Sequence, residues 1–234
     1  MMDIKLPDLV QTSRFLQIAS LLNAPITDLD QVKQNDICLI GLFEDHGHGL
    51  DFGARFAARQ IRYASYVDSL LPLTGNAPRI LDLGDLNVFP LERERNRAAL
   101  IRQIRAIVER GAVPIVVGGA FEMGPILQQV LRQHENMDVG HLQLRGHLEG
   151  ESLKDGSYLI ALTIDMVGWQ SATMHGERPL ARLQSTIERF PPQNIGAVYL
   201  TGLAPELDLC GRYETSLGKF VLEILIAHLC KAKA

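Results

Sequence analysis

The stretch VPIVVGGAFEM, Val113 to Met123, decides how this chain is expected to fold. Its first five residues form a short apolar run, which ends in Gly118-Gly119 and is followed at once by a helical pattern. An uninterrupted apolar run of this length is typical of a strand buried on both faces of a sheet. The two glycines then predict a tight turn at the carboxyl edge of that sheet, where α/β proteins place their sites.

The rest of the chain alternates between similar runs and helical patterns. Strands are predicted at Ile37–Phe43, Ile80–Gly84, Val113–Val117, Val139–Leu144, Tyr158–Ile164 and Ala197–Leu200. Helices are predicted at Phe52–Leu71, Leu91–Arg110, Glu122–His134, Arg178–Phe190 and Tyr213–Lys231. This alternation indicates a three-layer α/β/α fold with a mainly parallel sheet.

The domain organisation predicted from the sequence is simple. Residues 1–234 are expected to form one domain, with a helical extension at 1–34 and an α/β core at 35–234. Within the extension, a helix at Leu9–Leu22 is expected to pack on the outside of the core or against a partner subunit.

Composition excludes several classes of protein. The net charge of −4 comes from charges of mixed sign, and no basic stripe indicates binding to nucleic acid or to a membrane surface. The apolar runs are far shorter than a membrane span. The start of the chain lacks a signal-peptide pattern, and the three separate cysteines, Cys38, Cys210 and Cys230, are typical of buried thiols. A cytoplasmic location is expected.

Six segments, taken in chain order, resemble one family of enzymes. They are Ile40–Arg62 with its Gly53-Ala54-Arg55, the D-L-G-D of Leu81–Leu86, Val113–Met123, His141–Glu149, Leu162–Trp169 and Ala204–Asp208. Together they resemble the signatures of the arginase/agmatinase/formiminoglutamase (ureohydrolase) family. The chain is identified as a shortened and degenerate member, for which the resemblance implies an arginase-like fold.

The resemblance also implies a metal site, and the chain departs from it. Family enzymes hold two manganese ions with two His and four Asp, and these ions activate a water that attacks a guanidinium carbon. Matched position by position, Phe121, Arg145 and Val167 replace ligands, whereas His147, Glu149 and Asp165 retain a ligand type. Arg145, Glu149 and Asp165 together carry a charge of −1, too little to hold two divalent ions. We expect no metal, or at most one divalent ion.

Arg145 is the most informative of these replacements. We expect its guanidinium to take the place of the lost metal and to pair with Glu149 or Asp165 at neighbouring strand ends. The alternative is that Arg145 extends into solvent. Only fifteen residues separate Glu149 from Asp165, so the resemblance implies that substrate loops of the family are missing here.

Two further groups of polar residues have open interpretations. The loop Glu44–Gly49 carries His46 and His48, which are possible alternative metal ligands beside His147, although a solvated loop is the preferred interpretation. Asp82 and Asp85 are expected to be structural loop acids that bond backbone amides, Arg55 or Arg62, and the alternative for this pair is acid/base chemistry.

These observations lead to one functional hypothesis and a rival. The first is a ureohydrolase-fold protein with an eroded dinuclear manganese site, catalytically inactive and acting through assembly or ligand binding. The rival is a metal-dependent C–N hydrolase, acting on amidino or guanidino compounds with a reduced one-metal site. The resemblance implies a homo-oligomer, trimer or hexamer, or a hetero-complex with another protein, without nucleic acid or membrane.

Overall fold

The computed structural model describes residues 20–44, 53–67, 78–86, 92–119, 124–135, 139–145, 148–152, 159–166, 179–203 and 213–231. For residues 66–67, 145, 148–152, 179 and 213–214 it describes the backbone alone. The chain builds a seven-stranded sheet in the order β2-β1-β3-β7-β6-β4-β5, in which every neighbouring pair is parallel except β4 and β5. The strands are β1 (Ile37–Leu42), β2 (Ile80–Leu86), β3 (Val113–Val117), β4 (Val139–Arg145), β5 (Leu148–Ser152), β6 (Leu159–Asp165) and β7 (Ile195–Thr201).

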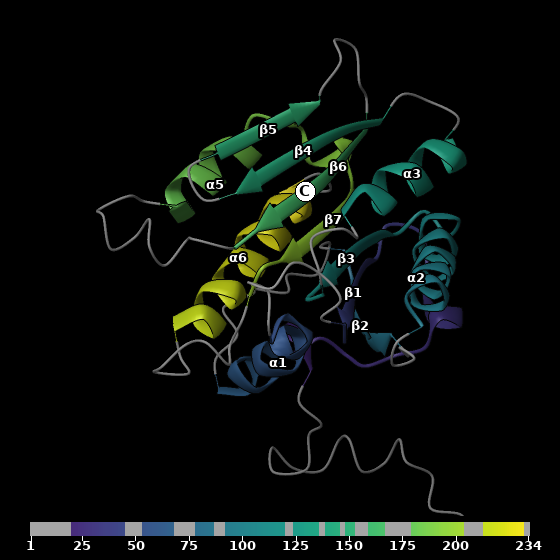
Figure 1. The fold of residues 1–234 in the computed structure, drawn as a ribbon, viewed down its shortest axis with the longest axis horizontal. Coiled ribbons are helices and arrows are strands. Elements are labelled where there is room, and N and C mark those ends of the chain that lie inside the picture. The colour runs from purple at the N-terminus through teal and green to yellow at the C-terminus, as the bar shows by residue number, and fades with distance from the viewer. Residues whose placement is uncertain are drawn as a thin grey trace, which may run out of the picture.

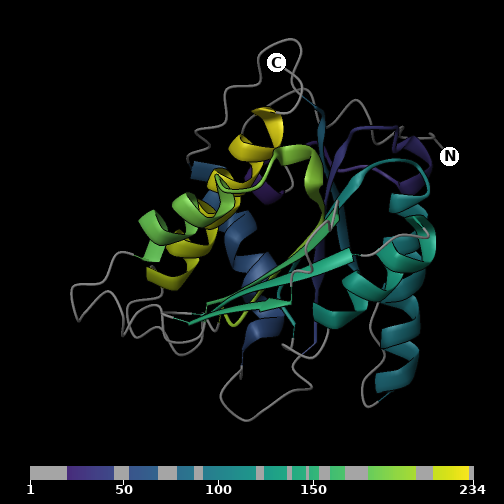
Figure 2. The ribbon, with the colours of Figure 1, turned by 90° about the horizontal axis from the view of Figure 1, so that it is seen from above.

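Helices cover both faces of this sheet, as Figures 1 and 2 show. The longer ones are α1 (Ala57–Val67), α2 (Arg93–Val108), α3 (Gly124–Glu135), α5 (Pro179–Ile187) and α6 (Tyr213–Cys230). The short 3-10 turns are η2 (Leu21–Asn23), η3 (Leu29–Gln31), η4 (Ala54–Phe56) and η6 (Pro192–Asn194). Helices α2 and α3 pack on one face, and α1, α5 and α6 on the other. The predicted three-layer α/β/α fold is therefore confirmed.

The core is divided between the two faces because side chains alternate along each strand. On β1, Leu39 packs with α1 and α6, whereas Cys38 and Ile40 pack with α2 and α3. All six residues of β1 are buried, which explains why its sequence is an unbroken apolar run. No helix in the described part of the chain combines the length and the apolar character that crossing a membrane requires.

The predicted elements are present with small changes at their ends. Each of the six predicted strands exists, and each of the five predicted helices begins or ends within about three residues of its expected limit where that limit is described. The segment predicted as one helix from Phe52 starts as the 3-10 turn η4 and continues as α1.

Strand β5 is absent from the sequence-based prediction. It pairs antiparallel with β4 at the margin of the sheet, with Leu148 opposite Arg145 and Ser152 opposite His141. Its sequence, LEGES, contains neither an apolar run nor an alternating pattern. A strand with a single neighbour buries less surface, so its sequence does not need the apolar run that identified the other six.

The amino-terminal prediction can be compared with the structure only at residues 20–34. Residues 9–19 lie outside the described part, and the end of the expected helix is the 3-10 turn η2, in which Leu22 and Asn23 both have φ of 55°. A left-handed backbone at two successive residues does not continue a right-handed helix. Residues 20–34 instead pack along β2, where Ile26 forms a parallel bridge with Asp82.

The cysteines were predicted to be buried thiols, and the structure confirms this for one of them. Cys38 is fully buried, and burial, followed by the nearby Asp36 carboxylate, raises its pKa to about 12, so it remains a thiol. Cys230 is only half-buried at the end of α6, and Cys210 lies outside the described residues.

Candidate functional site

The carboxyl ends of the parallel strands meet at one edge of the sheet. In their spatial order β1, β3, β7, β6 and β4, these strands end at Leu42, Val117, Thr201, Asp165 and Arg145. Segments that are far apart in the sequence are thereby placed side by side at the edge where α/β proteins form their sites.

The Gly118-Gly119 turn predicted from the sequence is the centre of this edge. Both glycines have left-handed backbones, with φ of 90° and 77°. The Gly118 N–H donates to the Leu200 carbonyl at 2.9 Å, and the buried Thr201 hydroxyl donates to the Gly119 carbonyl at 2.6 Å. A Cβ at Gly118 would lie 2.9 Å from the Ala54 carbonyl oxygen, so glycine is needed both for its backbone and for the close approach of η4.

Asp165 ends β6 beside this turn and is only 1% exposed. Its register partners are Thr201 on β7 and Arg145 on β4. Glu149 lies instead opposite Leu144, one position back along β4. Two acids were expected to pair with Arg145. The backbone register places Asp165 opposite Arg145 itself, whereas Glu149 is opposite the preceding residue, Leu144.

Several predicted site residues lie outside the described part of the chain. They are Phe121, His147, Val167, and the loop histidines His46 and His48. For Arg145 and Glu149 the structure gives the backbone position and not the side chain. Ligand roles assigned to all of these residues stay predictions.

Asp82 and Asp85 converge on one guanidinium, although they are three residues apart on a strand. In a regular strand such residues point to opposite faces. The register changes, however, from Leu39 opposite Asp82 to Gly41 opposite Asp85, so β2 has one residue more than β1 between these pairs. This β-bulge, with Gly84 at φ of 77°, turns both carboxylates toward Arg62 on α1.

The resulting cluster joins three parts of the fold. Arg62 Nε and Nη2 donate to the Asp82 carboxylate at 2.9 and 3.0 Å, and Nη1 donates to Asp85. Asp82 also accepts the backbone N–H groups of Leu21, at 2.7 Å, and Gly84, at 2.9 Å. Burial works to lower the pKa of Arg62, but the bonds to Asp82 and Asp85 outweigh it and raise that pKa. Asp82 is thus fully engaged in holding α1 and residue 21 against β2, an arrangement that favours the structural interpretation over acid/base chemistry.

Two other titratable groups lie near the sheet: Glu44, which belongs to the loop considered above as a possible metal site, and His141, to which the sequence pattern assigned no role. Glu44, two residues beyond β1, is only 4% exposed. His141 on β4 is half-buried, and its Nε2 lies 3.0 Å from the Thr163 hydroxyl on β6. Burial lowers the pKa of His141. No local pattern indicated this contact because the partner of His141 is on a different strand.

Comparison with known proteins agrees with this geometry. Residues 35–164 match the arginase family. Over 150 residues, the chain is 29% identical to the mitochondrial guanidino acid hydrolase of Rattus norvegicus, a match that covers 61% of this chain and 42% of that protein. Over 136 residues it is 29% identical to the mitochondrial agmatinase of Gallus gallus, covering 56% of this chain and 39% of that protein.

The alignments therefore span less than half of the length of these two relatives. Among solved structures, the agmatine ureohydrolase of Thermoplasma volcanium superposes with a TM-score of 0.69 at 16% identity, covering 91% of this chain and 94% of that one. At an identity of 16%, this superposition shows that the two proteins share a fold and nothing more.

Proposed function

This chain belongs to the arginase family, and from that premise we propose that it is a catalytically inactive member that acts through assembly or the binding of a ligand. The proposal depends on how the chain has changed at the edge of the sheet where the family resemblance places the metal ligands. It does not depend on the fold, which is compatible with activity and with its loss.

The register of Arg145 and Asp165 is the observation that supports this proposal most strongly. Asp165 is a retained ligand type and is almost completely buried, and Arg145, at a position where the family has a ligand Asp, is its direct neighbour on β4. A guanidinium paired with this carboxylate would stabilise it and oppose a divalent cation in the same place.

The donor chemistry of the chain fits two manganese ions poorly. Phe121 and Val167 carry no donor atom, and Arg145 is a cation at every physiological pH. Among the residues that the structure describes, no three His, Cys, Asp or Glu side chains form a group that could hold a metal, and the histidines at 46, 48 and 147 lie outside that part. We therefore derive no reaction step through a manganese pair.

The rival function is a hydrolase of C–N bonds in amidino or guanidino compounds, with one metal ion. Two buried acids lie at the same edge of the sheet, Asp165 as the last residue of β6 and Glu44 two residues after β1. Their hard oxygen ligands suit a divalent ion. In that case His46, His48 or His147 would complete the site with Glu149.

Metal content distinguishes the two functions. We would incubate the purified chain with excess Mn²⁺, desalt it and measure bound manganese by mass spectrometry. We expect no stoichiometric metal in the native chain, and more metal in Arg145→Asp, which restores a carboxylate beside Asp165. One ion per chain, lost in Asp165→Asn but kept in the surface variant Glu92→Gln, would contradict the proposal and support the one-metal hydrolase.

Assembly is tested separately by light scattering of the purified chain. We propose a homo-oligomer, a trimer or hexamer, or a complex with another protein. A monomer at micromolar concentration, purified without a stoichiometric partner, would exclude assembly and leave ligand binding as the mode of action. The cytoplasmic location stays a prediction, because the relatives named above are mitochondrial proteins.

A further inference from the structure

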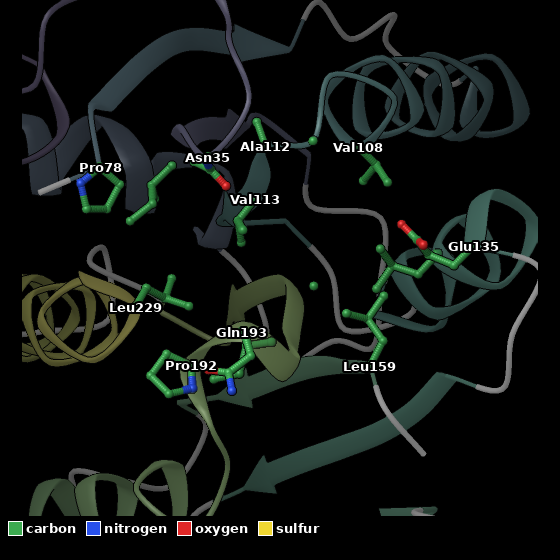
Figure 3. Close-up of a pocket in the computed structure, with 15 residues that line it drawn as sticks. Asn35, Pro78, Val108, Ala112, Val113, Glu135, Leu159, Pro192, Gln193 and Leu229 are labelled. Carbon is green, nitrogen blue, oxygen red and sulfur yellow. The ribbon is translucent and has the colours of Figure 1, made fainter. Parts of the chain in front are cut away.

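A cavity of about 260 Å³ lies at the opposite edge of the sheet, where the parallel strands begin. Ile37, Val113, Leu159 and Ile195 line it, and they are the first residues of β1, β3, β6 and β7. Figure 3 shows the side chains around this space. Because the length of the strands separates the cavity from Asp165, a ligand bound there is distinct from any ligand bound at the edge where Asp165 lies.

The walls of the cavity are mostly apolar, with a small number of polar groups. Pro78, Val108 and Leu229 complete the apolar lining. Of the fifteen described residues that line it, Glu135 is the one with a charged side chain. Figure 3 shows its carboxylate turned toward the space between Val108 and Leu159.

Three helices end at this cavity, which adds negative potential to the Glu135 charge. Val108 is the last residue of α2, Glu135 is the last residue of α3, and Leu229 is next to the last residue of α6. The carboxyl end of a helix behaves like roughly half a negative charge. Two basic residues of α3 lie near Glu135 and are not among the described residues that line the cavity. Arg132 donates to the Val139 carbonyl at 3.2 Å, and His134 Nε2 lies 3.7 Å from a Glu135 carboxylate oxygen.

We propose that this cavity binds a small organic cation, a primary ammonium group carried on a short apolar chain. The ammonium lies at the Glu135 carboxylate and the helix ends, and the chain occupies the apolar part between the strand starts. The volume is slightly below the range of about 300–1,000 Å³ that is typical of pockets for drug-sized ligands, so the ligand is small. Negative potential, with no basic side chain among the described lining residues, disfavours a carboxylate of the same size.

Three probes of equal length and different charge test this inference. Hexylammonium, hexanol and hexanoate would each be titrated into the full chain at pH 7.5, with binding measured from ligand NMR signals by saturation transfer and from protein chemical shifts. We expect hexylammonium to bind, hexanol to bind at least about threefold more weakly, and hexanoate not to bind at the same concentrations.

Variants then locate the site. Glu135→Gln should weaken hexylammonium about threefold to fivefold and reduce the difference between hexylammonium and hexanol, because Glu135 is partly exposed and its attraction is screened. Glu109→Gln, an exposed glutamate just after α2 that does not line the cavity, is the matched control and should leave binding unchanged. Val113→Phe should fill the cavity and abolish binding, with thermal unfolding used to verify that the variant is folded.

Other outcomes would overturn the inference. Equal binding of hexylammonium and hexanoate would show that the potential of the site does not select a cation. Equal affinity in Glu135→Gln and in the native chain, or persistent binding in a folded Val113→Phe variant, would place the amine elsewhere on the molecule. No binding of hexylammonium at millimolar concentration would exclude the site.

Discussion

At the scale of single residues, the cluster around Arg62 is the best-defined polar feature of the described chain. The Asp82 side chain is completely buried and the Arg62 side chain is 11% exposed, so their bonds are formed away from water. Removing one partner of such a pair leaves the other as an uncompensated buried charge, which is far more destabilising than loss of a surface ion pair.

We predict that Asp82→Ala lowers the free energy of unfolding by about 3–5 kcal/mol, since the Arg62 Nε and Nη2 groups and two backbone N–H groups lose their acceptor. Glu92→Ala is the control, because its bond to Arg95 joins two half-exposed side chains, and it should cost about 0.5 kcal/mol or less. Urea unfolding at pH 7.5 measures both. Similar losses in the two variants would show that the buried cluster contributes no more than a surface pair.

His141 gives a prediction for the dependence of stability on pH. Burial lowers its pKa in the folded chain below the ordinary value of 6.5, so below that pH the unfolded chain binds more protons than the folded one. Stability should therefore be complete above pH 6.5 and decrease as the pH falls toward the folded pKa. We expect His141→Gln to lose less stability between pH 8 and pH 5.5 than the native chain, as measured by urea unfolding.

His134→Gln is the control for this experiment, because His134 lies on the exposed end of α3. His228 stays present in all three proteins, and its pKa is also lowered, mainly by burial, so part of the acid sensitivity persists in each of them. An identical pH profile for the native chain and His141→Gln would exclude His141 as a source of that sensitivity.

At the scale of elements, the bulge in β2 explains how two acids three residues apart act together. The bulge leaves Asp85 opposite Gly41 on β1. A Cβ at Gly41 would overlap the Asp85 carboxylate and would lie 2.9 Å from the Ala58 Cβ on α1. The absence of a side chain at Gly41 therefore makes room for the ion cluster between the sheet and α1.

We predict that Gly41→Ala lowers the free energy of unfolding by about 1–3 kcal/mol, because the added methyl group forces Asp85 and α1 apart. Gly84→Asn is the matched control within the same bulge. Its Cβ position is open, and asparagine tolerates a positive φ, so the loss should be a few tenths of a kcal/mol. A larger loss for Gly84→Asn than for Gly41→Ala would contradict this account of the bulge.

At the scale of the whole molecule, residues 20–34 belong to the packed structure more closely than the predicted helical extension implied. The backbone of Asp82 exchanges bonds of 3.0 Å with Pro25 and Thr27, and the Asn23 side chain donates to the Ser65 carbonyl at 2.7 Å. The segment thus protects part of β2, which is otherwise the margin of the sheet.

A truncation experiment tests this role. We predict that a chain beginning at residue 35 unfolds at a clearly lower temperature than one beginning at residue 20, by about 5 °C or more, because it loses these bonds and a partner of Asp82. Scanning calorimetry of the two truncated chains measures the contribution of residues 20–34 directly. Equal unfolding temperatures would support the view of an extension that is separate from the core.

More of the fold than of the candidate site could be predicted from the sequence. Apolar runs of five to seven residues located the strands that are buried on both faces, such as β1 and β3, because burial dictates composition there. The polar strand β5 and the left-handed turn at Leu22 carried no such signal. The contact between His141 and Thr163, and the cavity beside Glu135, join residues from different elements, so no local pattern indicated them.

The sequence by itself therefore determined six of the seven described strands, the five longer helices, their α/β alternation, and the set of side chains near the strand ends. Tertiary structure decided the order of the strands, the bulge that turns Asp85 toward Arg62, and the register that brings Arg145 beside Asp165. The physical reason is that burial and backbone preference act on each segment locally. Register and shape, in contrast, are set when segments that are distant in the chain pack against each other.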